Sequence, residues 1–219
     1  FIVKTFLVQA FFIPSESMED TLVVGDRVVV SKLTPTPFDI DRGDVIVFDD
    51  PGDWLDESPQ VDRGPVLNGL SDALMFVGLL PDTSEGHLIK RVIGLPGDSV
   101  QCCDSDGRVL VNGEPIDERP YLKPGTEKNQ QEFNITVPQG SYWVMGDNRN
   151  DSSDSRFHDP SGNGADGSVP KDLVVGKAVV TVWPFGRMGG LSDHDKVFSD
   201  VPGAGSQSLA PPAREPHTS

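Results

Sequence analysis

Basic residues are scarce in this chain of 219 residues, and their scarcity excludes one broad class of partner. Lys and Arg together number 18, against 34 Asp and Glu, which leaves a formal net charge of −16 at pH 7. An acidic body of this kind repels phosphate backbones, so we expect no nucleic acid partner. Contact with a membrane would likewise have to be hydrophobic, because anionic lipid repels the same charge.

Cysteine is equally scarce. Cys102 and Cys103 are the only two and are adjacent, so the sequence has no zinc-binding spacing and no distant pair to form an ordinary disulfide. Neighbouring alpha carbons across a trans peptide lie ~3.8 Å apart, below the usual range for a disulfide. A vicinal disulfide is one possibility, but two free thiols on opposite faces of a strand are the favoured prediction. We expect no metal and no cofactor.

The sequence also lacks an apolar run long enough to cross a bilayer. A spanning helix needs ~20 mostly apolar residues, and the N-terminal run FIVKTFLVQAFFI, residues 1–13, is shorter. No small-residue cleavage site of the A-x-A type follows it. We interpret residues 1–13 as the end of a membrane anchor that begins upstream, or as a membrane-proximal strand. A buried core strand is the alternative.

Strand-like runs dominate the rest of the chain. They are rich in β-branched and aromatic residues and are separated by Gly, Pro, Asp and Asn. The runs lie at 27–33, 44–49, 87–94, 99–103, 108–113, 133–137, 141–146 and 177–183. The sequence DSDG at 104–107 predicts a tight hairpin turn. These features predict a mostly β protein, with antiparallel sheets joined by long loops.

Two segments depart from this pattern. An acidic, proline-bearing insertion at about 51–86 contains one short candidate helix at 66–80, where apolar residues recur at three- and four-residue steps. This helix would either cap a surface insertion or graze a membrane. From Ser192 to residue 219 the composition shifts to Ser, Pro, Gly and Ala, which predicts a disordered tail. The remaining stretch, 14–191, is expected to form one β domain.

A lysine lies inside one of the apolar runs. In HLIKRVIG, strand alternation puts Lys90 on the same face as Leu88 and Val92. A lysine that faces a core loses hydration, which lowers its pKa from the ordinary value of about 10.4. Lys90 is therefore a candidate general base. The alternative is an ordinary lysine at a strand edge whose ammonium group reaches solvent.

An acidic loop, GDNRNDSSDSRFHD, covers residues 146–159. A calcium site is the obvious alternative for such a loop. Counted from Asp159, a glycine falls at position six of an EF-hand, but position twelve is Pro170, where a bidentate carboxylate is required. We expect instead a rigid loop whose backbone is held by arginine–carboxylate pairs.

Four ordered stretches carry a family resemblance that none of them carries alone. They are PSESMEDTL at 14–22, GDRVVV with RGDVIVF at 25–30 and 42–48, KRVIGLPGD at 90–98, and GDNRNDSSDSR at 146–156. Together they resemble the type I signal peptidases, the bacterial leader peptidases that use a serine–lysine dyad. The family's usual proline before Thr-Leu is Asp20 here, which changes a turn rather than a chemical group. The resemblance implies that 14–191 is a catalytic β domain.

The resemblance also implies a role for single residues. Ser17 would be the nucleophile and Lys90 the general base. The Ser17 backbone N–H and the Ser15 hydroxyl would form the oxyanion hole. Ser152 would hydrogen-bond Lys90 and fix its direction. The residues that support the loop would be Asp154, Arg156, Asp147 and Arg149.

The chemistry of these side chains agrees with the implied roles. A serine hydroxyl needs a base within hydrogen-bond reach and a prepared site for the developing oxyanion. A buried lysine can supply the base, whereas none of the four histidines lies in a comparable setting. His158, which closes the acidic loop, stays open as an alternative base.

The resemblance finally implies a reaction, a substrate and a location. The chain would be a membrane-bound serine endopeptidase that removes N-terminal signal peptides from secretory preproteins, cutting after small residues at the −1 and −3 positions. Its partners would be those preproteins and membrane lipid, and its catalytic domain would lie on the extracytoplasmic side of the cell membrane.

Other functions stay open at this point. A self-cleaving repressor would share the dyad, but the sequence has no basic helical module before Ser17. A maturation peptidase of the conjugation type is a nearer relative. A third reading is an acidic β domain without enzymatic activity that binds a partner or calcium at the cell surface.

Overall fold

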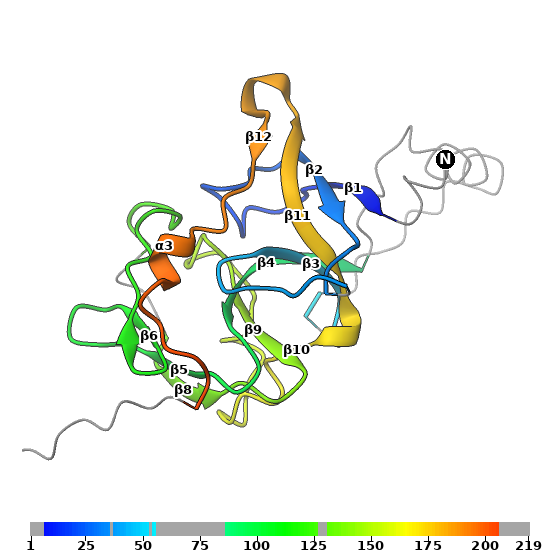
Figure 1. The fold of residues 1–219 in the computed structure, drawn as a ribbon. Helices are drawn as coiled ribbons and strands as arrows, with labels where there is room; N and C mark the ends of the chain where they lie inside the picture. Colours follow the sequence, from blue (N-terminus) through cyan, green and yellow to red (C-terminus); the bar gives the residue numbers. More distant parts are fainter. Residues whose placement is uncertain (1–6, 36, 53, 56–85, 127–130, 206–219) are drawn as a thin grey trace, which may run out of the picture.

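The computed structural model describes residues 7–35, 37–52, 54–55, 86–126 and 131–205, and β-strands dominate them (Figure 1). The larger sheet has eight strands in the order β1-β2-β11-β3-β4-β9-β10, and β12 pairs with β11 at one end. Neighbouring strands in this sheet run antiparallel. Its strands are β1 (Val8–Phe12), β2 (Arg27–Ser31), β3 (Val45–Asp49), β4 (His87–Gly94), β9 (Ser141–Met145), β10 (Val169–Pro170), β11 (Val174–Trp183) and β12 (Gly189–Gly190).

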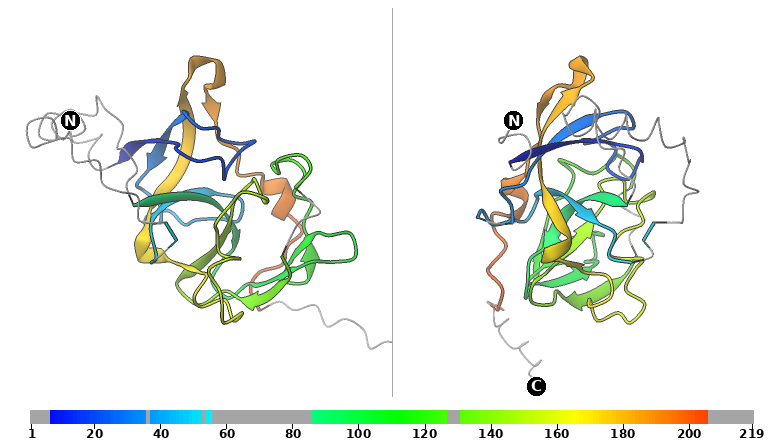
Figure 2. Two further views of the ribbon diagram at one scale, coloured as in Figure 1. Left: turned by 180° about the vertical axis from the view of Figure 1, so that it is seen from behind. Right: turned by 90° about the vertical axis from the view of Figure 1, so that its right-hand side faces the viewer.

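A smaller sheet of four antiparallel strands, in the order β7-β6-β5-β8, lies beside one end of the larger sheet (Figure 2). The chain enters it directly from β4, through a turn at Leu95–Asp98. Its strands are β5 (Ser99–Cys102), β6 (Val109–Val111), β7 (Glu114–Pro115) and β8 (Phe133–Thr136). Helical structure among the described residues is limited to η1 (Lys171–Leu173), η2 (Phe185–Arg187) and α3 (Asp195–Phe198).

The predicted fold class is confirmed, since each strand-like run of the sequence contains one of these strands. The hairpin turn predicted at 104–107 joins β5 to β6, and Gly107 takes a left-handed conformation there with φ of 81°. Three short strands, β7, β10 and β12, have no clear sequence signal, because two or three residues cannot show an alternating pattern.

Strand β4 is buried on both faces, which places its single lysine inside the protein. Ile89 belongs to an apolar core with Phe11 and Met18, on one side of the larger sheet. Leu88 and Val92 belong to a second core on the other side, and the end of β4 reaches a third core under the smaller sheet. This central position explains why an apolar run such as HLIKRVIG shows no solvent-facing stripe.

The chain beyond Ser192 differs from the prediction at its start. Residues 191–205, which we name the C-terminal strap, fold back across both sheets, with Phe198 and Val201 buried in the core that contains Trp143. The few large apolar residues of the strap after Ser192, Val197, Phe198 and Val201, do not alter its average composition, so the composition alone indicated disorder. Residues 206–219 lie outside the described residues.

The other predicted segments are covered in part. Residues 8–12 form the strand β1, and residues 1–6 lie outside the described part. No helix within the described ranges is long and apolar enough to cross a membrane. The candidate helix at 66–80 lies outside the described residues, as does the insertion from residue 56 to residue 85.

The favoured prediction for the cysteines is wrong. Cys102 and Cys103 are joined as a vicinal disulfide rather than left as two free thiols. The prediction assumed a trans peptide between them, whereas this peptide is cis and the alpha carbons lie 3.0 Å apart. Both residues pack against the core under the smaller sheet.

Candidate active site

Ser17 lies in the turn that follows β1 and is almost fully buried, with 6% of its surface exposed. Two contacts from the acidic loop hold the backbone of this turn. Asn148 N–H donates to the carbonyl of Ser17 at 3.0 Å, and the Asn148 side-chain amide donates to the carbonyl of Glu16 at 3.2 Å. The turn is therefore positioned by a residue more than a hundred positions further along the chain.

Lys90 lies in the middle of β4, opposite Ile46 of β3. Its Nζ is 2.8 Å from Ser17 Oγ and 3.1 Å from the carbonyl oxygen of Ile89. The fold thus brings together two residues 73 positions apart, at hydrogen-bond distance and inside the protein.

Burial determines the acid–base character of Lys90. The side chain has lost its hydration, which lowers its pKa to about 8. The carboxylates of Asp154 and Asp147 act in the opposite direction and Arg156 acts in the same direction, but burial is the larger effect. An amine with this pKa is partly neutral near pH 8, so it can accept a proton from a hydroxyl.

The predicted pair of Asp154 and Arg156 is present and fully buried. Arg156 Nε donates to Asp154 Oδ1 at 2.8 Å, and Asp154 Oδ2 accepts the backbone N–H of Gly146 at 2.9 Å. These bonds hold the pKa of Asp154 below its ordinary value although burial alone would raise it. Asp154 therefore stays ionised and fastens one end of the acidic loop to the other.

Ser152 takes a different partner from the expected one. Its hydroxyl donates to Asp154 Oδ2 at 2.8 Å, whereas the hydrogen bonds of Lys90 Nζ go to Ser17 and to the backbone of Ile89. Ser152 is nevertheless close to the dyad, because a Cβ added to Gly146 would lie 2.2 Å from Ser152 Oγ and 2.5 Å from the Ser17 carbonyl oxygen.

Asp147 is paired with an arginine that the sequence analysis did not select. Arg91, the neighbour of Lys90, donates to both carboxylate oxygens at 2.9 and 2.7 Å, and Thr21 Oγ1 donates to Oδ2 at 2.6 Å. Asn148, Arg91 and Thr21 all lie within the four stretches that carried the family resemblance. Their presence there was the available signal, but strand alternation alone placed Arg91 simply on the face opposite Lys90.

Arg149, predicted to support the loop, reaches away from the dyad toward the smaller sheet. Its Nε donates to the carbonyl of Gly146 at 3.0 Å, and its Nη1 donates to Glu118 Oε2 at 2.9 Å. Both residues of this pair are buried. The five predicted supporting residues therefore lie in one connected network around Gly146, with Glu118 as a member that the sequence analysis missed.

Ser15 lies on the open side of Ser17. Its hydroxyl is 3.3 Å from Ser17 Oγ and the residue is exposed. A hydroxyl in this place can rotate toward an oxygen bound next to Ser17, so it is available as a hydrogen-bond donor there.

His158, the alternative base, has other contacts. Its Nε2 is 2.7 Å from Ser153 Oγ, and its ring stacks on Trp54 with 4.5 Å between ring centroids. Partial burial lowers its pKa below the ordinary value. The Asp159 carboxylate accepts the backbone N–H of Gly164 and the hydroxyl of Ser161, so the candidate calcium residue takes part in a local turn.

Among the described residues, the strand that carries Lys90 is paired on one side only near the site. Residues His87–Lys90 pair with β3, and β9 begins its pairing with β4 only at Arg91. Phe11 of β1, the first strand in the sheet order, meets His87 edge to face, with 5.3 Å between ring centroids. The sheet therefore curls until its first strand approaches the unpaired half of β4, and Ser17 lies at that approach.

Comparisons with known proteins identify the family of this chain. The family described as signal peptidase, peptidase S26, matches residues 1–183. A probable signal peptidase I of Mycobacterium leprae is 42% identical over 216 residues, covering 87% of this chain and 74% of that protein. The signal peptidase I of Mycobacterium tuberculosis is 41% identical over 207 residues, covering 86% and 69%. A crystal structure of a signal peptidase I from Enterococcus faecalis is 25% identical, with a TM-score of 0.37, covering 63% of this chain and 95% of that one.

Proposed function

This chain belongs to the signal peptidase family, peptidase S26, and from that membership we propose that Ser17 and Lys90 form the dyad with which it cleaves signal peptides from secreted preproteins. The observation that supports this most directly is the 2.8 Å contact between Lys90 Nζ and Ser17 Oγ, both on buried residues. A nucleophile with its base at hydrogen-bond distance is the minimum that acyl transfer needs.

The reaction follows from this pair. Neutral Lys90 takes the proton of Ser17 as the hydroxyl oxygen attacks the carbonyl carbon of the scissile peptide. The ammonium group that results gives the proton to the leaving amine, and an acyl–Ser17 ester remains. Water attacks the ester with Lys90 again as base, and the Lys90 ammonium then returns the proton to Ser17 Oγ as the carboxyl product leaves. The carboxylates of Asp154 and Asp147 stabilise Lys90 while it is charged.

The oxyanion that forms at each attack needs donors beside Ser17. We assign this task to the Ser17 backbone N–H and to the Ser15 hydroxyl, which lies 3.3 Å from Ser17 Oγ. The exposure of Ser15 supports the assignment, because a donor on the open side of the nucleophile is where a substrate carbonyl would arrive.

The unpaired half of β4 suggests how a preprotein binds. An extended peptide can add to the His87–Lys90 segment as a strand, which directs its backbone past Ser17. Apolar side chains of Phe11 and Ile89 lie beside this path and leave room only for small residues in our proposal. This arrangement accounts for a preference for small side chains at −1 and −3.

The direct test is cleavage of a synthetic secretory precursor with Ala at −1 and −3, followed by mass measurement of the products. We expect one cut, directly after the −1 residue. The same peptide with Leu at both positions is the control and should be cut at least tenfold more slowly, since a misfit of this size costs ~1–3 kcal/mol per site. Equal cleavage of both peptides, or cuts elsewhere, would contradict the proposed specificity.

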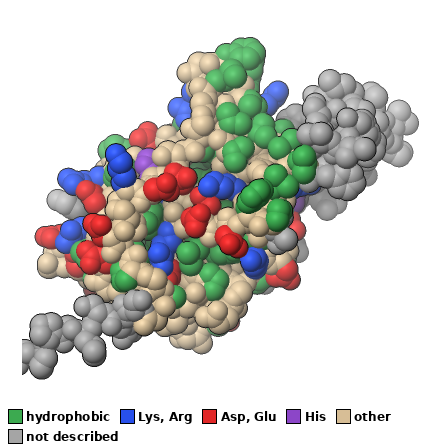
Figure 3. Space-filling view, viewed as in Figure 1, with side chains coloured by type: hydrophobic (Ala, Val, Ile, Leu, Met, Phe, Trp, Pro, Cys, Tyr) green, Lys and Arg blue, Asp and Glu red, His purple; other side chains and the backbone are tan. Residues whose placement is uncertain are grey.

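A projecting hairpin supports a position at the membrane surface. It is formed by the end of β11, η2 and β12, and it carries Trp183, Phe185 and Met188 with 43, 72 and 55% of their surfaces exposed (Figure 3). The connection between its strands is tied to the segment that follows Ser17, because Arg187 in η2 donates to Asp26 Oδ1 at 3.1 Å. An apolar tip that enters lipid would hold the dyad close to the bilayer, where a preprotein's own apolar segment ends.

The hairpin is therefore expected to matter only when lipid is present. The double substitution Phe185→Ser and Met188→Ser should weaken binding to phosphatidylcholine vesicles roughly tenfold or more, because each buried apolar side chain contributes ~1.5–3 kcal/mol. Vesicle co-sedimentation measures this effect, and cleavage of a soluble precursor peptide should stay unchanged. Phe38→Ser is the matched control, since Phe38 is 59% exposed in another loop. Equal loss of vesicle binding in the control would contradict a specific role of the hairpin.

A further inference from the structure

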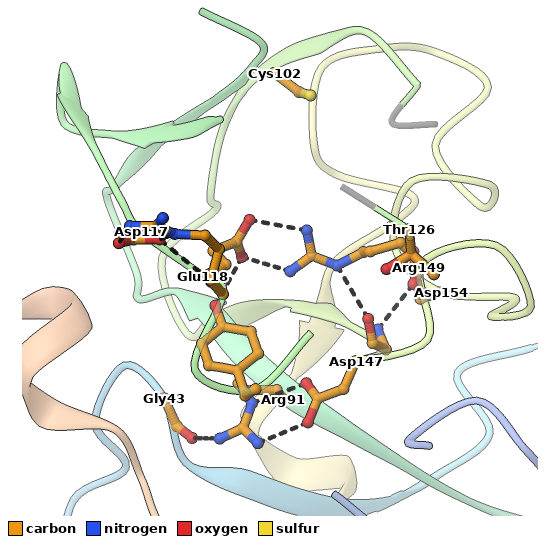
Figure 4. Close-up of polar contacts among 12 residues, drawn as sticks. Gly43, Arg91, Cys102, Asp117, Glu118, Thr126, Asp147, Arg149 and Asp154 are labelled. Atoms are coloured by element: carbon orange, nitrogen blue, oxygen red, sulfur yellow. Dashed lines mark hydrogen bonds and ion pairs between the residues drawn. The ribbon is translucent and has the colours of Figure 1, made fainter. Parts of the chain in front are cut away.

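A buried ion pair connects the acidic loop to the smaller sheet, outside the dyad. Glu118, in the loop between β7 and β8, accepts Arg149 Nη1 on Oε2 at 2.9 Å and Arg149 Nη2 on Oε1. The two side chains are 3 and 0% exposed. A bidentate pair of this kind fixes the plane and direction of the guanidinium group, not only its charge. Figure 4 shows the Glu118 carboxylate hydrogen-bonded to two nitrogen atoms at the edge of the Arg149 guanidinium group.

Glu118 is itself held in place by a third residue. Tyr121 O–H donates to Glu118 Oε1 at 2.7 Å, and both groups are buried. The Tyr121 ring in turn lies against the guanidinium of Arg91, 4.4 Å from the ring centroid. Arg91 is the residue after Lys90 and binds Asp147, as Figure 4 also shows. Two buried cations, Arg91 and Arg149, are thus balanced by two buried carboxylates.

The network extends to Gly146, a residue that packs against the backbone of Ser17. Arg149 Nε donates to the carbonyl of Gly146, whose own N–H is bound by Asp154. There is no space between Gly146 and Ser17, because a Cβ on Gly146 would come within 2.5 Å of the Ser17 carbonyl oxygen. A displacement of Arg149 would therefore reach Ser17 through one hydrogen bond and one close contact.

The loop between β7 and β8 makes a second set of polar contacts, with the acidic loop and with the Ser17 turn. The backbone N–H of Lys123 donates to the carbonyl of Asp147 at 3.1 Å, and Lys123 Nζ binds Glu19 Oε2 at 2.6 Å, two residues after Ser17. The segment 118–123 thus contacts both the acidic loop and the Ser17 turn. It comes from the smaller sheet, which contributes no atom to the dyad.

We propose that Glu118 is a positioning residue for catalysis, which fixes Ser17 relative to Lys90 by holding Arg149 against Gly146. This inference rests on the proposed function of the dyad. A misplacement of reacting groups by about 1 Å can lower a rate roughly 100-fold, so a remote residue that controls such a distance affects kcat without touching substrate. The peptide-binding edge at His87–Lys90 makes no contact with Glu118 among the hydrogen bonds of the described residues, so KM should be preserved.

The first experiment replaces Glu118 by Gln, which keeps the size and removes the charge. We expect kcat for a synthetic secretory precursor to fall roughly tenfold to 100-fold, with KM within twofold of the wild-type value. Asp117→Asn is the matched control, because Asp117 is the preceding residue, is exposed, and pairs only with exposed Arg119. This control should leave kcat and KM unchanged.

The second experiment separates positioning from stability. Glu118→Gln removes the carboxylate that accepts Arg149 Nη1 and Nη2, which should also lower the melting temperature because Arg149 stays charged and buried. The double variant Glu118→Gln with Arg149→Gln removes that buried charge as well, so the melting temperature should recover. The bond from Arg149 Nε to Gly146 is lost in the double variant, so kcat should remain low. If kcat recovers together with the melting temperature, Glu118 acts through stability alone and the proposal is wrong.

A milder variant covers the case in which Glu118→Gln does not fold. Tyr121→Phe removes only the hydroxyl that orients Glu118 and retains the ring beside Arg91. We expect a fall in kcat of roughly three- to tenfold at unchanged KM, and wild-type kcat in this folded variant would overturn the proposal. Failure of the wild-type chain to cut the precursor would instead reject the proposed function, so the two failures are distinguishable.

Discussion

Replacement of Lys90 by Met is expected to lower kcat/KM for a secretory precursor roughly 1,000-fold or more, while the protein remains folded. Met fills a similar volume in β4 but has no basic atom to take the proton of Ser17, and general-base catalysis alone contributes ~10²–10⁴-fold. Ser17→Ala should have an effect at least as large, because it removes the attacking oxygen. Precursor cleavage followed by mass spectrometry measures both. Turnover within tenfold of wild type in either variant would reject the dyad.

The same substitution should stabilise the protein at neutral pH. Burial lowers the pKa of Lys90 from 10.5 to about 8, so below pH 8 the folded state carries a buried charge that the unfolded state exposes to water. At ~1.4 kcal/mol per pH unit, removal of this charge adds roughly 3–4 kcal/mol to the free energy of unfolding below pH 8. Between pH 8 and 10.5 the unfolded chain binds the proton and the folded chain does not, so the advantage of Met shrinks with rising pH.

The wild-type enzyme provides the matching pH control. If Lys90 is the base of the proposed dyad, only its neutral form is active, so kcat/KM should rise with pH along a limb whose midpoint lies near 8, the pKa of Lys90. His158 would instead give a limb below its ordinary value of about 6.5, because burial lowers its pKa. A limb near 10 would show that Lys90 is hydrated in the active enzyme.

Substitution of Gly146 by Ala has the second large expected effect. The added methyl group would lie 2.2 Å from Ser152 Oγ and 2.5 Å from the Ser17 carbonyl oxygen, closer than atoms in proteins approach. Neither Ser152 Oγ nor the Ser17 carbonyl oxygen belongs to a long, flexible side chain that could swing aside. The Ser17 turn must therefore move away from Lys90. We expect kcat to fall roughly 100-fold and the free energy of unfolding to fall by ~1–3 kcal/mol.

Enzyme kinetics and thermal unfolding together check this prediction. Gly203→Ala is the control, because nothing lies within 4 Å of a Cβ at that position, and it should change neither quantity. If Gly146→Ala keeps wild-type kcat, then the close packing of Gly146 against Ser17 does not set the position of the nucleophile.

Much of the fold was predictable because its information is local. Runs rich in β-branched and aromatic residues located β2, β3, β4, β5, β6, β8, β9 and β11, and DSDG located the β5–β6 turn. β1 lies in the N-terminal segment, for which the end of a membrane anchor and a strand were alternatives. The strap at 191–205 was not predictable from composition, since Phe198 and Val201 are ordered by a core built from distant residues. The vicinal disulfide was only the less favoured alternative for a related reason. The spacing of Cys102 and Cys103 does not reveal the geometry of the peptide bond between them.

In the candidate site, too, some residues were predictable from the sequence and others were not. The place of Lys90 in an apolar run made a buried base one of two alternatives, beside a lysine at a strand edge, and its partner Ser17 came from a resemblance rather than from spacing. The partners that orient the site were harder to predict, because they join residues 56 positions apart in Arg91–Asp147 and 31 apart in Glu118–Arg149. Charge pairs can be expected in an acidic loop that contains two arginines, but the sequence does not specify which carboxylate each one meets.

The C-terminal strap sets the boundary at which this protein can be shortened for recombinant expression. The match to the peptidase family ends at residue 183, yet Ser192 accepts a hydrogen bond from Arg91, and Pro202 accepts one from Asn112 at 2.8 Å. A fragment that stops where the family match stops would uncover an apolar core and remove an acceptor from the arginine beside Lys90. Fragments for inhibitor screening should therefore extend to Gly205, and affinity tags belong after that residue.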